Sequence, residues 1–542
     1  MNNQRGQFSK HAVQNGLVVN RGGRFGSSLI AAMLMLTGCG GSDDGSQSSG
    51  AAGASHTQIA SVAAVLEGTT HPLVARLNIP AVDPGSTVEV EFGINRSYGR
   101  STPRAVVTSG AATILVAGMQ ARSGYHIRAK VVKADGSTHY TQDFLFNTGV
   151  LPDNLASVRF KAETAPGKTL PLGVELISSA TGPHQPYAVD LRGNIIWYYP
   201  WTDYEASFTA AGVEQMANGN FITTLGQSYN LPVTGTPDPT KSLVREFNLL
   251  GETVKQVTIS ELNAKLAMAG NSITLGVFHH HVEVLPNGHW LLLANTVKVV
   301  DGLPVLGDVI IDIDADMKPV WVWNSFDHMD VNRRPMELQD WTHGNAVVYS
   351  PTDGNLLISL RHQHWVLKVN YQNGAGDGAV IWRLGKGGDF TLINGSDPTD
   401  WQYAQHFPVF VGPTSAGKFD LSLMDNGTER IGTDGLKCGT QGAPACYTTM
   451  PLFRIDEQAR TATILSRVTL PPNLFSAFGG NGELLANGNF EYNLCAVPSG
   501  AVIQERTPDD SHALVWSLTN LNGHFIYRGF RMQSLYPGVT WN

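Results

Sequence analysis

The stretch Asn287-Gly288-His289-Trp290-Leu291 decides the fold, because an Asn-Gly turn leads directly into an apolar, aromatic strand. Similar turns followed by apolar runs recur at 218–221, 353–356, 487–490 and 522–525. Between them, short turns precede strands that carry a tryptophan, at 193–197, 317–321, 378–382 and 513–516. The hairpins are spaced on the order of 60 residues apart, longer than in short propeller repeats. This repetition predicts a series of small antiparallel sheets.

The composition is that of an all-β protein. The 542 residues include 58 glycines and only 15% charged residues, which is typical of aromatic strands joined by glycine turns. A single blade cannot bury both faces of its sheet, so several blades must close on themselves. From about six weak units we predict a six-bladed β-propeller, the catalytic domain, over residues 160–542. A large double sandwich is the alternative.

Residues 56–150 predict a separate, small β-sandwich. Apolar and polar residues alternate strictly over 88–94 and again over 125–132, and Asp135-Gly136 is a hairpin signal. The segment from Leu115 to Tyr125 resembles the corner of a fibronectin type III domain, where a tyrosine hydroxyl bonds back to the preceding turn. Such a fibronectin III-like domain is usually a spacer or docking module.

The first 39 residues predict a lipoprotein signal peptide. Basic residues precede a short apolar run from Leu29 to Leu36, too short for a permanent span. Leu36-Thr37-Gly38-Cys39 resembles the bacterial lipobox, which implies cleavage before Cys39 and lipid attachment to its sulfur. An ordinary secretory signal with a chance cysteine is the alternative. Residues 40–55 are rich in Gly, Ser and Ala and predict a flexible tether.

Export places the protein in the periplasm of a Gram-negative bacterium, anchored to a membrane through its lipid. Gly40 after Cys39, rather than Asp, favours the outer membrane.

An oxidising compartment permits disulfides, and we expect one between Cys438 and Cys446, which flank a glycine-rich loop. Cys495 is expected to be a buried thiol. The net charge of −8 excludes nucleic acid as a partner, and self-association is left open.

Polar residues at the ends of several apolar strands are the candidate site. They are the run His279-His280-His281, the pair His343 and Asn345, then Arg361, and finally His406. In a regular strand His279 and His281 face one way and His280 the other. A strand that ends in such a residue presents it at the mouth of a propeller, so we expect these side chains to converge on one anion. Metal binding is the alternative, but a guanidinium repels a metal ion and favours an oxyanion. A structural calcium in the propeller remains open.

Five motifs together resemble the bacterial arylsulfate sulfotransferase family. In chain order they are Trp341-Thr342-His343-Gly344-Asn345, Leu357-Ile358-Ser359-Leu360-Arg361, Ile381-Trp382-Arg383-Leu384-Gly385, Gln405-His406 and Leu423-Met424-Asp425-Asn426-Gly427. The resemblance covers roughly residues 160 to 540. It implies a six-bladed propeller with its active site in the central channel and no nucleotide sulfate donor. No complete Gly-x-x-x-x-Gly-Lys-Ser/Thr loop is present to cradle a nucleotide, because the stretch 412–418 is followed by Phe419 in place of the Ser or Thr.

The resemblance also implies residue roles. His406 would be the nucleophile that is transiently sulfated, while His343 and Arg361 would hold sulfuryl oxygens with Asn345 beside them. The family pattern near 279 is usually His-His-Asp, and this chain has His281 in the place of the aspartate. Either His279 or His280 would complete the site, and we favour His280.

Aromatic residues near these motifs are candidates for stacking on phenolic rings. We expect Trp401 and Tyr403 to bind substrate, with His279 as a further contact, and Trp341 and Trp365 are weaker candidates. A place in the propeller core is the alternative for each aromatic residue.

The predicted activity moves a sulfuryl group from an aryl sulfate to a phenol by a ping-pong reaction. Such a transfer resembles phosphoryl transfer, in which positioning and charge stabilisation dominate. The alternatives are a non-catalytic propeller that binds a partner or polysaccharide, and a sulfatase-like hydrolase in which water intercepts the sulfo-histidine.

Overall fold

The computed structural model describes residues 61–201, 208–227 and 241–541. The predicted signal peptide with Cys39 and the predicted tether lie outside the described residues. Strands make up 47% of the structure and helices 6%, which confirms the all-β prediction. None of the helices in the described segments is both long and apolar enough to cross a membrane.

Two antiparallel sheets precede the larger repeat. The first contains β1 (Val65–Gly68), β2 (Ala75–Ile79) and β6 (Ala112–Val116); the second contains β3 (Thr87–Gly93), β4 (Arg100–Ser101), β5 (Ala105–Val106), β7 (Gly124–Val132), β8 (Thr138–Tyr140) and β9 (Phe144–Asn147). Alternate side chains of β3 and β7 are buried in one core. The Tyr125 hydroxyl accepts a hydrogen bond from the Gln120 amide at 3.0 Å, so the predicted tyrosine corner is present.

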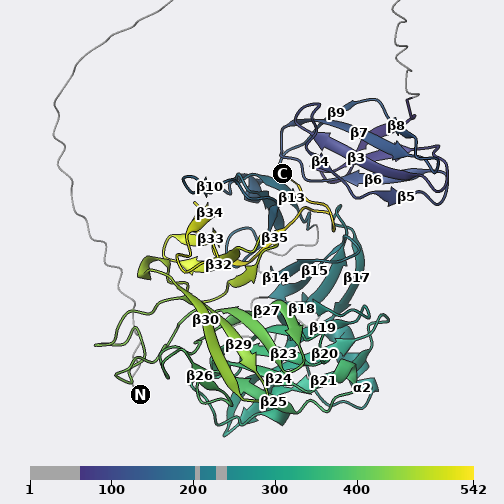
Figure 1. The fold of residues 1–542 in the computed structure, drawn as a ribbon. Coiled ribbons are helices and arrows are strands. Elements are labelled where there is room, and N and C mark those ends of the chain that lie inside the picture. The colour runs from purple at the N-terminus through teal and green to yellow at the C-terminus, as the bar shows by residue number, and fades with distance from the viewer. Residues whose placement is uncertain (1–60, 202–207, 228–240, 542) are drawn as a thin grey trace, which may run out of the picture. The chain divides into compact units, whose positions relative to one another are not determined.

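Six further sheets follow, drawn from blue through teal and green to yellow in Figure 1. In order around the repeat, the first sheet contains β35 (Ile526–Met532), β11 (Val174–Ser179), β12 (Tyr187–Asp190) and β13 (Ile195–Tyr198), and the second contains β14 (Phe208–Gln215), β15 (Phe221–Gln227), β16 (Leu243–Phe247) and β17 (Thr253–Thr258). The third contains β18 (Phe278–Val284), β19 (Trp290–Val300), β20 (Leu303–Ile313) and β21 (Pro319–Asn324), and the fourth contains β22 (Gly344–Tyr349), β23 (Leu356–Leu360), β24 (Trp365–Val369) and β25 (Val380–Leu384). The fifth contains β27 (His406–Ser415), β28 (Lys418–Met424), β29 (Thr449–Asp456), β30 (Thr461–Thr469) and β26 (Thr391–Ile393), and the sixth contains β31 (Asn481–Leu484), β32 (Phe490–Val497), β33 (Gly500–Arg506), β34 (Leu514–Asn520) and β10 (Phe160–Thr164).

Helices are short. They are α1 (Asp153–Ala156), α2 (Ile259–Met268) and α3 (Ser325–His328), with 3₁₀ turns η2 (Arg361–Gln363), η3 (Gln372–Gly374) and η4 (Pro472–Leu474). The longest, α2, begins with a capping box in which the side chains of Thr258 and Glu261 satisfy each other's backbone amides.

The six sheets follow one another in a closed series. The edge strands β35, β14, β18, β22 and β27 each contact the next edge strand of the series, which ends at β31, and β32 contacts β35. Strands from opposite ends of the chain complete the first and last sheets, because β35 pairs with β11 and β10 pairs with β34. A closed ring of blades leaves only short, protected sheet edges. The propeller-like fold is confirmed, and the six sheets favour the predicted number of blades.

The repeated tryptophans hold successive sheets together. Each buries its ring, and its indole N–H donates a hydrogen bond to the neighbouring sheet or its loops. The acceptors are the Leu249 carbonyl for Trp197, the Gly376 carbonyl for Trp321, the Glu457 carboxylate for Trp382 and the Leu191 carbonyl for Trp516. The repeat seen in the sequence is therefore a packing requirement, since a buried indole needs an acceptor.

Candidate functional site

The predicted histidines lie on, or directly before, three consecutive edge strands, and each strand loses its regular pairing there. Register shifts occur between Phe278 and Val282 in β18, at the start of β22, and between His406 and Val409 in β27. His280, His343 and Phe407 have left-handed backbones, with φ of 62°, 48° and 47°. This conformation costs a non-glycine residue about 1 kcal/mol, and bulges re-aim side chains. Three strands thus store strain at one place, which is typical of functional sites.

These bulges bring the imidazoles together. The ring of His280 lies 4.9 Å from that of His343 and 5.4 Å from that of Tyr527, which is on β35. Tyr527 lies in turn 6.5 Å from His406. Side chains from four sheets therefore meet in one cluster, as the sequence predicted for the histidines.

The protonation state of His406 follows from its partners. Asn426 donates both amide protons, to the carbonyls of Ser476 at 2.8 Å and Gly479 at 3.0 Å, so its Oδ1 atom is an acceptor. Nδ1 of His406 lies 2.6 Å from that oxygen and must carry a proton. Nε2 therefore keeps its lone pair, and it accepts a long hydrogen bond from the Gly479 amide at 3.3 Å.

His406 is also kept neutral. It is 1% exposed, and burial together with the charges of Arg528 and Arg361 lowers its pKa well below the usual 6.5. Burial and the neighbouring imidazoles lower the pKa of His280 in the same way. A neutral imidazole whose Nε2 keeps its lone pair is a nucleophile at neutral pH.

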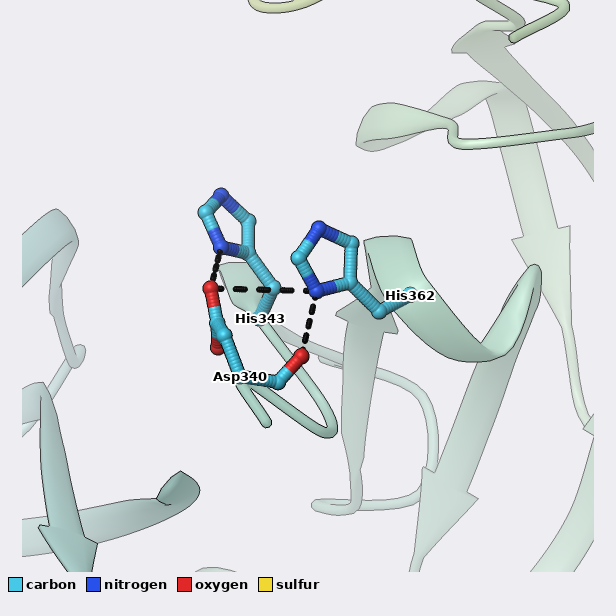
Figure 2. A group of neighbouring side chains, drawn as sticks. All are labelled: Asp340, His343 and His362. Carbon is cyan, nitrogen blue, oxygen red and sulfur yellow. Dashed lines mark hydrogen bonds and ion pairs between the residues drawn. The ribbon is translucent and has the colours of Figure 1, made fainter. Parts of the chain in front are cut away.

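Asp340 organises the opposite side of the cluster (Figure 2). Its carboxylate lies 2.5 Å from Nδ1 of His343, and its carbonyl lies 2.5 Å from Nδ1 of His362. The two rings lie 4.4 Å apart, and Figure 2 shows their other nitrogens on the side away from Asp340. Arg361, in the turn η2, donates to Nε2 of His362 at 2.7 Å. One aspartate thus orients His343 directly and Arg361 through His362.

The same three residues are a candidate metal group, because their ligand atoms lie within 4.8 Å of one another. However, Nδ1 of His362 donates to the Asp340 carbonyl, and its Nε2 accepts from a guanidinium. Two imidazoles and one carboxylate also suit calcium poorly, since calcium prefers oxygen ligands. The arrangement favours an anion beside Arg361, and a structural calcium elsewhere stays an untested prediction.

Several polar atoms of the cluster are buried without a hydrogen-bond partner in the described residues. They are Nε of Arg361, Oδ1 of Asn345, Nε of Arg528 and the hydroxyl of Tyr527. Asn345 meanwhile donates to the Gln405 carbonyl at 2.7 Å and so fixes the strand that leads into His406. Three of the four atoms are donors, and unsatisfied buried donors are rare unless a site uses them.

The other members of the histidine run have different surroundings. His279 is buried, with Nε2 at 3.2 Å from a carboxylate oxygen of Asp308. His281 is buried and bonds Glu214 at 2.8 Å, while its Nδ1 faces the amide of Val347. His280 is the partly exposed member and contacts His343, and the choice of His280 over His279 stays a prediction.

No ring contact is recorded between Trp401 or Tyr403 and the imidazole cluster in the described residues, and their role in substrate binding stays a prediction. They are 2% and 1% exposed in the core between two sheets, beside Trp382. The Tyr403 hydroxyl donates to the Pro398 carbonyl at 3.0 Å. A blade core needs large aromatic rings as much as a phenol-binding wall does, so core packing is the alternative role of both residues. Trp341 and Trp365 are buried as well.

The predicted disulfide between Cys438 and Cys446 is present, and Cys495 is a buried free thiol, as predicted.

Sequence reasoning missed four residues of the cluster: Asp340, His362, Tyr527 and Arg528. Asp340 and His362 directly flank the predicted motifs and offered a signal. Tyr527 and Arg528 offered none, since they are distant in sequence and reach the cluster only through closure of the ring.

Fold and site together define a propeller-like protein with a centre of imidazole and guanidinium groups. A model of the arylsulfotransferase (ASST) family matches residues 134–515. The match covers more than half of the sequence, and the chain belongs to this family. The family supports aryl sulfotransferase activity in general, without a nucleotide sulfate donor.

Solved structures are similar to this chain at low identity. A protein of unknown function from Bacteroides caccae is 10% identical, covers 66% of this chain and 98% of its own, and has a TM-score of 0.39. A dihydro-heme d1 dehydrogenase is 14% identical, with coverage of 68% and 77% and a TM-score of 0.31. A rhamnogalacturonan lyase from Bacillus licheniformis is 12% identical, with coverage of 87% and 90% and a TM-score of 0.22. No curated protein sequence matches the chain.

Proposed function

We propose that this protein transfers a sulfuryl group from an aryl sulfate to a phenol by a ping-pong reaction through sulfo-His406. The general activity follows from the family. The observation that supports the finer mechanism is the fixed tautomer of His406, in which Asn426 binds the Nδ1 proton and leaves Nε2 as the nucleophile.

In the first half-reaction Nε2 attacks the sulfur atom and an N–S bond forms. The bond between sulfur and the aryl oxygen breaks, and the phenolate leaves with the bonding pair. The Gly479 amide, which faces Nε2 at 3.3 Å, becomes free to donate to a sulfuryl oxygen. Arg361 balances the charge on the sulfuryl oxygens, where a loose transition state keeps most of it.

His343 moves the proton. Its Nδ1 is held by Asp340, so its other nitrogen protonates the departing phenolate. In the second half-reaction that nitrogen takes the proton of the incoming phenol while the phenol oxygen attacks sulfur and the N–S bond breaks. The cycle returns His406 to its neutral form and needs no cofactor. General acid–base help of this kind contributes about 10² to 10⁴-fold.

The test is incubation with 4-nitrophenyl sulfate, with and without added phenol. Transfer predicts phenol-stimulated release of nitrophenol, and a mass spectrum of protein treated with donor alone should show one sulfuryl group on His406. Release that ignores phenol would indicate a sulfatase-like hydrolase. No release in either case would indicate a binding protein. Stimulated release that persists in His406→Ala would overturn the nucleophile assignment.

The cellular location is a separate proposal. The lipobox at Cys39 supports a periplasmic lipoprotein, anchored through that cysteine in the outer membrane. Replacement of Cys39 by Ser should release the protein from the membrane fraction, and unchanged membrane association would contradict the anchor.

A further inference from the structure

Arg528 is a buried arginine with an unusual set of partners. It lies on β35, is fully buried, and donates to the carbonyls of Gly480 and Asn345, the latter at 3.1 Å. Its Nε atom has no acceptor among the described residues. Its guanidinium lies 4.2 Å from the ring centre of Tyr527 and 4.9 Å from that of Phe407.

Two other arginines with little exposed side chain have carboxylate partners. Three residues further along the same strand, Arg531 is paired with Glu175, Glu491 and Glu505. Arg430 is paired with Asp425. No carboxylate in the described part of the chain pairs with Arg528 within ion-pair distance. A buried charge without a counter-charge is costly, so its retention requires a reason.

The reason lies in what surrounds it. Asn345, whose carbonyl accepts from Arg528, lies two residues after His343. Gly480, the other acceptor, directly follows Gly479, whose amide donates to Nε2 of His406. Arg528 thus connects the backbone segment beside His343 with the backbone segment beside His406. Its charge also acts on His280 and His406 and lowers the pKa of both.

We propose that Arg528 is a positioning residue of this site, whose unshared positive charge makes the cluster select an anionic sulfate ester. This inference rests on the proposed function. Arg361 would contact the sulfuryl group. Arg528 would not touch the substrate: its positive charge attracts the anion electrostatically, and its hydrogen bonds hold the Asn345 and Gly480 carbonyls in place. Because β35 is the closing strand, the anion site is complete only once the ring has closed.

Substitutions at one position separate charge from structure. Lys keeps the charge but cannot bridge both carbonyls, whereas Met keeps the bulk and removes the charge. Arg454→Met is the matched control, because Arg454 is exposed and pairs with Asp420 on the surface. Circular dichroism of each purified full-length variant establishes that it is folded.

The first measurement is calorimetric binding of 4-nitrophenyl sulfate in a His406→Ala background, where no sulfuryl group can be accepted. Arg528→Met should weaken binding about tenfold or more, Arg528→Lys by less than about threefold, and Arg454→Met not at all. Unchanged affinity in Arg528→Met, or equal losses in the Lys and Met variants, would overturn the proposal.

The second measurement is the pH profile of kcat/KM with His406 intact. The groups that face His406 are His280, His343, Arg361, Arg528 and Tyr527. Loss of the Arg528 charge raises the pKa of His406, so the acid limb should move to higher pH in the Met variant and stay in place in the Lys variant. If the acid limb of the pH profile stays in place in both the Met and the Lys variant, the proposal is also overturned. If the wild-type protein transfers no sulfuryl group, the proposed function fails, and the binding comparison still decides the role of Arg528.

Discussion

The carboxylate of Asp340 lies 2.5 Å from Nδ1 of His343 and fixes which nitrogen of that imidazole faces the cluster. The interaction is local in sequence, because the two residues are three apart, and His343 turns toward it with a left-handed backbone. A carboxylate in this position holds the tautomer and stabilises the imidazolium that forms during proton transfer.

Asp340→Asn should therefore slow transfer by about 10²-fold, because His343 becomes a weaker acid–base group. The loss should be larger with phenyl sulfate than with 4-nitrophenyl sulfate, since the poorer leaving group depends more on a proton. Rates with both donors check this, and Asp316→Asn, on the surface beside Lys318, is the control. Equal losses with the two donors would show that Asp340 has no part in proton transfer.

Asn426→Ala should lower kcat with little change in KM. The variant loses the acceptor that holds the Nδ1 proton of His406, so the ring is free to turn or to change tautomer. We expect a loss of about 10²-fold in the rate at which sulfo-His406 forms, measured by rapid quench and mass spectrometry. Asn95→Ala, on the surface of the N-terminal sheets, is the control. A normal rate of sulfation in Asn426→Ala would contradict the tautomer argument.

The sequence predicted the parts of the site that lie in local motifs. His280, His343, Arg361 and His406 could be chosen because each follows or begins an apolar strand, and the repeated tryptophans indicated the sheets. The left-handed backbones could not be predicted, because they result from bulges that tertiary packing imposes. Arg528 was missed for a related reason, since β35 reaches the site only by pairing with β11, more than 300 residues earlier. Composition does not separate a core ring from a substrate-binding ring, so the roles of Trp401 and Tyr403 stay predictions.

Buried neutral histidines should make stability depend on pH. Burial lowers the pKa of His71 to about 4 and those of His362 and His364 to about 3. The unfolded chain takes up protons below about 6.5, whereas the folded protein does not. This stability is therefore fully present above pH 6.5 and is lost as the pH falls from 6.5 toward 4, by up to about 1.4 kcal/mol per pH unit for each residue.

Thermal unfolding at constant ionic strength between pH 7.5 and 5 measures this dependence. His71 is the best probe, since both ring nitrogens are occupied, one by the Tyr198 carbonyl at 2.9 Å and the other by the Leu73 amide at 3.0 Å. His71→Asn should show a shallower slope than the wild-type protein, and His139→Asn, whose ring bonds only Ser137 among the described residues, should not. A flat pH profile in the wild-type protein would contradict neutral burial.

The disulfide between Cys438 and Cys446 should stabilise the loop that follows Asn426. It closes a short segment, with a sequence separation of 8, so loss of the bond should lower the free energy of unfolding by about 2–3 kcal/mol. Within the loop, Lys437 donates to the Pro335 carbonyl at 2.9 Å, and the Thr428 hydroxyl donates to the Ala477 carbonyl at 2.7 Å. These contacts join the loop to the segment after α3 and to the segment that leads into Gly479. Denaturant unfolding of the wild-type protein with and without reductant, and of the double Ser variant, measures the effect.

Because Cys495 is free and buried, Cys495→Ser is the control that separates loss of the bond from loss of a thiol. Equal stability of the oxidised and reduced protein would mean that the loop is held by its hydrogen bonds alone.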